Sequence, residues 1–187
     1  TSVNHIMIDV ETLGTTADAV ILSIGAVRFD LDSDAIDDKA FYASISIESN
    51  LDYKRRVSES TLMWWLQQSS DAQKVFFEPK DTLPNALCQL SDWMATDNNF
   101  VWSNGADFDL PMLAHAYTQT VIDIPWKFYN SRCARTYKNL PGMKNVTVPK
   151  IGTHHNALHD AIYQARHMQA IQRALTGNKG AKVKAAA

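Results

Sequence analysis

HIMIDV, residues 5–10, is a short apolar run that includes an acid near its end. A continuous apolar run of this length is typical of a strand that is buried on both faces. Two β-rich segments follow it, AVILSIGAVRFD (19–30) and AFYASISI (40–47), and polar turn sequences separate the three. Short connections are typical of antiparallel neighbours. The first segment therefore predicts the central strand of a sheet that opens with a three-strand antiparallel meander.

Beyond the meander, helical and strand-like segments alternate. Helices are expected at 58–68, 82–95, 107–119 and 159–175, and short strands at 99–103 and within PWKFYN (125–130). In the last helix, Ala161, Ala165 and Met168 recur at helical spacing, and Gly177 follows as a stop signal. The order predicts an α/β protein with a mixed five-stranded sheet, in which parallel strands extend the meander and helices cover both faces. This arrangement resembles the ribonuclease H-like architecture.

Length and composition indicate one domain. The chain has 187 residues, 45% of them apolar, so residues 1–176 are expected to bury a full core. Residues 177–187, GNKGAKVKAAA, are small, polar and basic, which predicts a flexible tail. The sequence contains no run long enough to span a bilayer, no signal-peptide pattern and only two cysteines, Cys88 and Cys133. We therefore expect a cytoplasmic protein without a membrane partner.

Two carboxylates, Asp9 and Glu11, stand at the end of the first strand. Residues two apart in a strand point to the same side. Unpaired, the two carboxylates would repel each other and be costly to desolvate. A divalent cation would offset both costs, and carboxylate oxygens suit Mg²⁺ or Mn²⁺. The alternatives are a solvated turn with ordinary acids, or a pair that an arginine or lysine neutralises.

A third carboxylate, Asp109, opens a helix in SNGADFDLPML (103–113), just after the strand expected at 99–103. Strand ends in open α/β sheets are common ligand sites. The alternative is that Asp107 or Asp109 only caps the helix and complements its dipole. We assign the cap to Asp107 and the chemistry to Asp109.

The segment HHNALHDAIYQA (154–165) supplies the last two candidates, His155 and Asp160. Asp160 falls in the first turn of the last helix, where an acid is already favourable through the helix dipole. A lone histidine is more often a surface or core residue than a catalytic one, and His154 and His159 are further histidines in the same segment. His155 is singled out by its spacing of five residues to Asp160.

Together these residue types match the needs of phosphodiester hydrolysis. Carboxylates from one strand and two helix starts can surround two metal ions. Two-metal sites place the ions about 3.5–4 Å apart and stabilise the attacking and leaving oxygens of a phosphoryl displacement. A histidine, with an ordinary pKa of about 6.5, can take the proton of an attacking water near neutral pH.

Three segments, IDVETLG (8–14), SNGADFDLPML (103–113) and HNALHDAIYQA (155–165), resemble in this order the exonuclease motifs of the DEDDh, or DnaQ-like, 3′-5′ exonuclease family. The resemblance runs from residue 8 to about residue 170. The third segment is the most specific, because it has the family's His-x-Ala-x-x-Asp followed by Ala. In the second motif the family acid follows phenylalanine and precedes an apolar residue, which favours Asp109 over Asp107. The short chain also resembles free-standing bacterial and phage exonucleases, including the mycobacterial exoribonuclease-like group, which implies a bacterial cell or a phage-infected host.

The resemblance implies a role for each of five residues. Asp9, Glu11 and Asp160 would hold the metal of the attacking water. Asp9 would also bridge to the second metal, which Asp109 would support, and His155 would be the general base. The cofactors would be two divalent ions, Mg²⁺ or Mn²⁺.

Candidates for substrate contact are less well defined by sequence. They are Thr12, Leu13, Asn104, Phe108, Trp64 and Arg135. Aromatic rings hold single strands by stacking. Trp64 and Trp65 are adjacent on a helix and point about 100° apart, so one can pack in the core while the other faces substrate. Lys54-Arg55-Arg56 is either a phosphate contact or a solvated loop. Thr15 stands where many relatives have a leucine that wedges against the terminal bases.

The predicted function is a two-metal-dependent 3′-5′ exonuclease that releases nucleoside 5′-monophosphates from single-stranded nucleic acid, with DNA favoured over RNA. The alternatives are a 3′-5′ exoribonuclease, an endonuclease, and a non-catalytic nucleic-acid-binding module of the same fold. The net charge of −2 and pI of about 6.3 favour none of these, since an acidic, metal-loaded pocket needs no basic surplus. By resemblance, the partners are DNA or RNA 3′ ends and a second copy of the chain.

Overall fold

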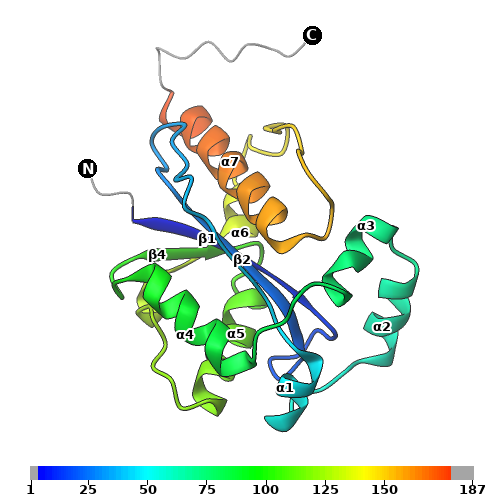
Figure 1. Cartoon of the computed structure of the whole chain (residues 1–187). Coiled ribbons are helices and arrows are strands. Elements are labelled where there is room, and N and C mark those ends of the chain that lie inside the picture. The colour runs from blue at the N-terminus through cyan, green and yellow to red at the C-terminus, as the bar shows by residue number, and fades with distance from the viewer. Residues whose placement is uncertain (1–3, 178–187) are drawn as a thin grey trace.

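The computed structural model describes residues 4–177, and a five-stranded sheet forms the centre of this part (Figure 1). Its strands are β1 (His5–Thr12), β2 (Ile21–Phe29), β3 (Phe41–Ser44), β4 (Phe100–Ser103) and β5 (Ser131–Cys133). Their order across the sheet is β3-β2-β1-β4-β5. The first three form an antiparallel meander, whereas β4 runs parallel to β1 and β5 parallel to β4. The predicted mixed sheet is confirmed, with β1 as its central strand.

Helices cover both faces of this sheet (Figure 1). They are α1 (Ile47–Asp52), α2 (Glu59–Leu66), α3 (Ser70–Gln73), α4 (Leu83–Met94), α5 (Asp109–Gln119), α6 (Ala134–Lys138) and α7 (Ala157–Thr176). Ile8 of β1 belongs to a core shared with α4 and α5, and Met7 to a second core shared with α6 and α7. Alternate strand residues point to opposite faces. Asp9 and Glu11 therefore lie on the same face as Met7, beneath α7.

Close contact between β2 and the start of α7 depends on Gly25. This residue pairs with Asp9 in the β1–β2 register. A Cβ atom at Gly25 would lie 2.3 Å from the carbonyl carbon of Ala157 and 2.3 Å from the backbone nitrogen of Leu158. Only glycine therefore allows the first turn of α7 to rest directly on the sheet. That contact fixes the height of α7 above Asp9.

A third apolar cluster lies beyond the meander, under α2 and α3. Leu13, Leu22 and Trp65 are buried in it together with Val75. The sequence predicted α2 but neither α1 nor α3, which have six and four residues. Helices this short show too little periodicity to be recognised. Their serine caps are clear only in the structure, where Ser46 and Ser69 accept N–H groups of Ser49 and Ala72.

The edge strand expected within residues 125–130 is displaced. Residues Phe128–Asn130 form a 3₁₀ turn, η2, and β5 begins at Ser131, which pairs with Val101. Pro125 has no N–H for a ladder, and Phe128 is 87% exposed, so this apolar segment does not behave as a sheet element. The expected third strand also ends early, at Ser44, because Ser46 caps α1.

The end of α7 and the state of the two cysteines agree with the predictions from sequence for the residues that the structure describes. Helix α7 ends at a left-handed Gly177, as predicted. The rest of the expected basic tail lies outside the described residues. Cys88 and Cys133 are both free thiols within residues 4–177. None of the helices in this range is long and apolar enough to cross a membrane.

Candidate active site

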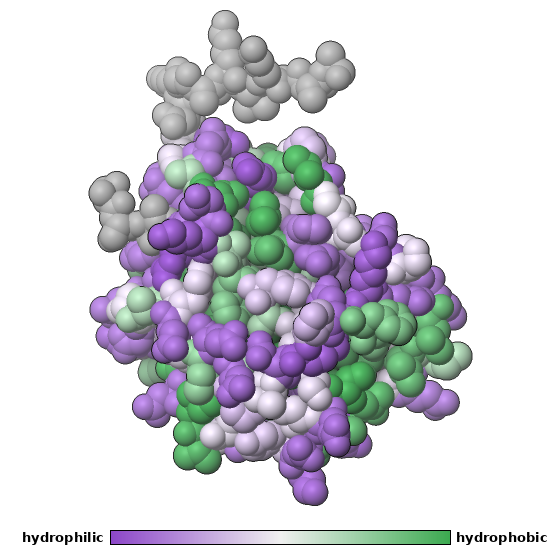
Figure 2. Space-filling view, in the orientation of Figure 1, coloured by the Kyte–Doolittle hydropathy of each residue, from purple (hydrophilic) through white to green (hydrophobic). Residues whose placement is uncertain are grey.

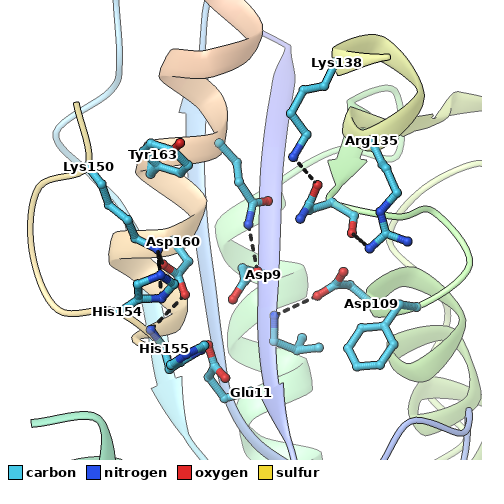
Figure 3. Close-up of a pocket in the computed structure, with 14 residues that line it drawn as sticks. Asp9, Glu11, Asp109, Arg135, Lys138, Lys150, His154, His155, Asp160 and Tyr163 are labelled. Atoms are coloured by element: carbon cyan, nitrogen blue, oxygen red, sulfur yellow. Dashed lines mark hydrogen bonds and ion pairs between the residues drawn. The ribbon is translucent and has the colours of Figure 1, made fainter. Parts of the chain in front are cut away.

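Three predicted carboxylates converge where β1 meets the start of α7 (Figure 3). Carboxylate oxygens of Asp9, Glu11 and Asp160 all lie within 4.8 Å of one another. The strand period places the first two side by side, and the Gly25 contact brings the third down to them. Gln164, one helical turn after Asp160, donates a 3.0 Å hydrogen bond to Asp9 Oδ1. Sequence reasoning missed Gln164, although its i+4 spacing from Asp160 was a usable signal.

Asp109 closes the group from the opposite side. It is the first residue of α5 and only 3% exposed, and its Oδ1 accepts the backbone N–H of Val10 at 3.0 Å. The helix cap predicted for Asp107 is wrong. Phe108, whose side chain cannot accept a hydrogen bond, occupies the N-cap position, and Asp107 is exposed. The backbone turns at Gly105, with φ of 108°, and this turn directs Asp107 to solvent and Asp109 inward.

His155 stands beside Asp160 in a strained turn. Its φ is 61°, a left-handed conformation that is uncommon for residues other than glycine. Its backbone N–H donates to Asp160 Oδ2 at 3.1 Å. Its ring packs edge-on against Trp64, with centroids 4.7 Å apart. The turn therefore fixes both the position of His155 relative to Asp160 and the plane of its imidazole.

Crowding of the carboxyl groups changes their acidity. Burial, followed by the charges of Asp109, Glu11 and Asp160, raises the pKa of Asp9 well above its ordinary value. Burial and then Asp160 raise the pKa of Glu11 to about 8, and burial raises that of Asp109 to about 7. For His155, burial and the neighbouring His154 lower the pKa, which favours the neutral imidazole.

These carboxylates fit a divalent cation. The sequence left open that a basic side chain neutralises these carboxylates, and Lys150 Nζ does lie 2.9 Å from Asp160 Oδ1. This ion pair covers one oxygen of one carboxylate. One ammonium group cannot balance four carboxylates. Hard oxygen ligands held this close together are the donor set that Mg²⁺ and Mn²⁺ prefer. Asp9, Glu11 and Asp160 could hold one such ion, with Asp109 facing it across β1.

Two adjoining pockets share Val10, Glu11 and Phe108 in their walls. The first, of about 510 Å³, contains the carboxylates and His155, and three cationic residues also line it, Arg135, Lys138 and Lys150. The second, of about 380 Å³, is mostly apolar and lies between Thr12, Trp64 and Phe108. A charged pocket beside an apolar one matches the phosphate and the base of a nucleotide.

Most of the predicted substrate residues reach these pockets. Asn104, Phe108 and Arg135 line the first, and Thr12, Trp64 and Phe108 line the second. Leu13 does not, because it is 2% exposed within the cluster around Trp65.

The two tryptophans divide as expected, with Trp65 at 1% exposure and Trp64 at 39%. Arg55 is not a phosphate contact, since it is buried and donates to the carbonyl oxygens of Ala17 and Ala19.

The comparisons with known proteins decide the family. The family described as 3′-5′ exoribonuclease Rv2179c-like domain matches residues 4–172, almost the whole described chain. The chain belongs to this family. It is a hydrolase of the 3′-5′ exonuclease type.

Two further similarities agree with this assignment. An exodeoxyribonuclease of Enterobacteria phage T4 is 24% identical over 155 residues, which cover 70% of this chain and 68% of the relative. The X-ray structure of the RNase domain of the yeast Pop2 protein superimposes with a TM-score of 0.63 at 13% identity. That match covers 92% of this chain and 78% of the Pop2 domain, and it confirms the ribonuclease H-like fold.

Three residues of the first pocket, Lys138, Lys150 and Tyr163, could not be found from the sequence of this exonuclease, whereas Arg135 was predicted. Arg135 and Lys138 of α6 both contact Asn104, through its backbone carbonyl at 3.1 Å and its side-chain oxygen at 2.6 Å. Lys150 belongs to a loop without regular structure, and Tyr163 lies one turn after Asp160. Lysines in loops carry no periodic signal, so only the folded chain places them at the site.

The carboxyl groups predict how the stability of metal-free exonuclease depends on pH. The pKa of Glu11 is about 8 in the folded protein against an ordinary 4.5, so the folded state retains a proton that the unfolded chain has lost. Stability falls with pH wherever the folded state binds more protons. We therefore expect the melting temperature in EDTA to fall as pH rises from about 5 to 8. Mn²⁺ should restore it most at high pH, where the ligands are deprotonated.

Differential scanning calorimetry of wild type and Glu11→Gln checks this expectation. The variant cannot ionise at residue 11, so its melting temperature in EDTA should depend less on pH. A wild-type melting temperature that rises from pH 5 to 8, or an unchanged slope in the variant, would contradict the assigned pKa shift.

Proposed function

We propose that this exonuclease is a DEDDh enzyme that hydrolyses the 3′-terminal phosphodiester of a single strand with two divalent ions and releases nucleoside 5′-monophosphates. The observation that carries the proposal is the convergence of Asp9, Glu11 and Asp160 within 4.8 Å, together with a histidine whose backbone is bonded to the same Asp160. Asp109 completes the set of four acids. When bound, the ions would supply charge stabilisation for the phosphoryl oxygens and make water a stronger acid.

His155 is the proposed proton acceptor. Its lowered pKa keeps the imidazole neutral near pH 7, the form that can take a proton. The contact with Trp64 holds the ring plane, and the hydrogen bond from its backbone to Asp160 keeps it beside the carboxylates. After proton transfer, the negative charge of Asp160 stabilises the imidazolium that forms.

Replacing His155 by Gln is expected to reduce turnover about 10²–10⁴-fold, because a positioned general base contributes an acceleration of that size. His154→Gln is the matched control, since His154 is the adjacent histidine and is exposed. Single-turnover hydrolysis of a labelled strand in Mg²⁺ measures both. If His155→Gln kept the rate of His154→Gln, His155 would not be the base.

The two pockets support a proposal for how the strand end is held. The terminal base would enter the apolar pocket between Trp64 and Phe108, where stacking does not depend on base identity. Its phosphate would lie in the charged pocket near Arg135. Apolar side chains of α2 are exposed near Trp64, at Met63 and Leu66 (Figure 2). Bases further along the strand could rest on this surface.

We propose that the preferred substrate is RNA, in place of the DNA preference expected from sequence. The matched family is described as exoribonuclease and covers residues 4–172, whereas the phage relative named for DNA is 24% identical. A competition between 5′-labelled RNA and DNA of one sequence tests the choice, and monomers are identified by chromatography. Faster loss of RNA supports it, and faster loss of DNA would overturn it. Rapid cutting of circular single strands would instead indicate an endonuclease.

Dimerisation and a cytoplasmic location stay predictions from the sequence. Sedimentation measures the first directly.

A further inference from the structure

A second cluster of metal-ligating atoms adjoins the carboxylates and shares only Asp160 with them. Ring nitrogens of His154 and His155 and a carboxylate oxygen of Asp160 all lie within 4.8 Å of one another. Figure 3 shows the three side chains together at the start of α7. We propose that His154, His155 and Asp160 form an inhibitory site for Zn²⁺, or an ion of similar preference, that shuts off the exonuclease.

The backbone creates this cluster. In extended chain, adjacent side chains point in opposite directions. Here the left-handed conformation of His155, with φ of 61°, brings the rings of His154 and His155 to the same side, with centroids 4.4 Å apart and planes 33° apart. Strained backbone of this kind persists where the surroundings hold it and is concentrated at functional sites. The proposed proton transfer takes place on His155, and His154 affects it only by lowering the pKa of the neighbouring ring.

The donor set distinguishes this site from the carboxylate site. Two imidazole nitrogens and one carboxylate oxygen are a common three-ligand set for Zn²⁺, whose fourth position takes water. Mg²⁺ prefers oxygen ligands and binds such a set weakly. The two clusters should therefore select different ions, although Asp160 belongs to both.

A cationic group already lies in the cluster. Lys150 Nζ is 2.9 Å from His154 Nδ1 and 2.9 Å from Asp160 Oδ1. The cluster thus accommodates positive charge between His154 and Asp160. A metal ion would have to displace this ammonium group, which makes Lys150 a competitor for the site. Removing the lysine should consequently strengthen Zn²⁺ binding, an effect opposite to that of removing a ligand.

Inhibition follows from the shared residues, and this part of the inference rests on the proposed function. A Zn²⁺ ion on His155 would occupy the lone pair that accepts the proton of water. The same ion would take one oxygen of Asp160 from the carboxylate site. Zn²⁺ should therefore inhibit hydrolysis even when Mg²⁺ is in large excess.

Isothermal titration of the full chain with Zn²⁺, in excess Mg²⁺, tests the site without reference to activity. Wild type should bind one tight equivalent. His154→Gln should weaken that binding at least about tenfold, since a change even in a residue that only orients a ligand costs about 10–100-fold. Lys150→Ala should tighten it. His159→Gln is the control, because its ring accepts the N–H of Thr153 outside the cluster, and it should bind as wild type does. Equal affinity of His154→Gln and wild type would overturn the site.

A strand-degradation assay in Mg²⁺ with increasing Zn²⁺ tests the inhibition. Each protein is compared with its own rate without Zn²⁺, and His154→Gln should need at least about tenfold more Zn²⁺ than wild type for half inhibition. Equal sensitivity of the two proteins would overturn the inhibitory role. Binding by calorimetry without any inhibition would also overturn it, and would count against His155 as the base while leaving the metal site intact.

Discussion

Replacing Asp9 by Asn is expected to reduce strand degradation at least roughly 10³-fold. Burial raises the pKa of Asp9, and the nearby charges of Asp109, Glu11 and Asp160 raise it further. As an amide it would lack the negative charge with which a carboxylate holds a divalent ion. Metal-ion catalysis supplies several kcal/mol of stabilisation, and about 1.4 kcal/mol corresponds to tenfold in rate. Single-turnover assays in saturating Mg²⁺ measure the loss.

The same variant should become more stable without metal. Removing one of four crowded carboxylates relieves repulsion, so the melting temperature of Asp9→Asn in EDTA should exceed that of wild type at pH 8, while Mn²⁺ should no longer raise it. A stable but inactive protein separates a lost site from a lost fold. Asp107→Asn, which changes an exposed acid two residues from Asp109, should leave both rate and stability unchanged. Wild-type turnover in Asp9→Asn would mean that the site is misassigned.

Gly25→Ala is also expected to have a large effect, on both stability and rate, although Gly25 contains no reactive group. The added methyl would lie 2.3 Å from backbone atoms of Ala157 and Leu158, so α7 must move outward and carry Asp160 with it. Forcing an extra carbon into a packed core costs about 1–3 kcal/mol. A displacement of about 1 Å at a reacting centre can cost about 10²-fold in rate. Urea unfolding and single-turnover assays should show both losses.

Gly177→Ala is the control that separates a loss of stability from a displacement of Asp160. Gly177 ends the same helix in a left-handed conformation, and a Cβ atom there would have no atom of residues 4–177 within 4 Å apart from its chain neighbours. The substitution should cost roughly 1–2 kcal/mol through the backbone alone, at the end of α7 far from the site. It should keep full activity at temperatures where the protein is folded. If Gly25→Ala also kept full activity, the contact between β2 and α7 would not position Asp160.

The sequence predicted those parts of the site that depend on local periodicity. The two-residue period of β1 placed Asp9 and Glu11 on one face, and the apolar run around them indicated a central strand. Apolar spacing along α7 and its glycine stop located the last helix, although it begins at Ala157 rather than 159.

Features that depend on the path of the chain in space were not predictable. Asp107 and Asp109 are equivalent as potential caps in the local sequence, but after the turn at Gly105 the N-cap position falls to Phe108 and only Asp109 points inward. Arg55 appears in a basic run that suggests solvent, yet it is buried and bonded to backbone carbonyls. Lys150 reaches Asp160 from a loop whose path has no periodic pattern. Each case depends on a long-range contact that local sequence does not encode.

The most direct test of the central claim is a time course on a 5′-labelled single strand with wild type and Asp160→Asn, in Mg²⁺ and in EDTA. The account predicts a ladder that shortens from the 3′ end in Mg²⁺ with wild type, and none in EDTA or with the variant. A ladder that persists in EDTA, or that Asp160→Asn produces at the wild-type rate, would contradict hydrolysis by metal ions held on these carboxylates.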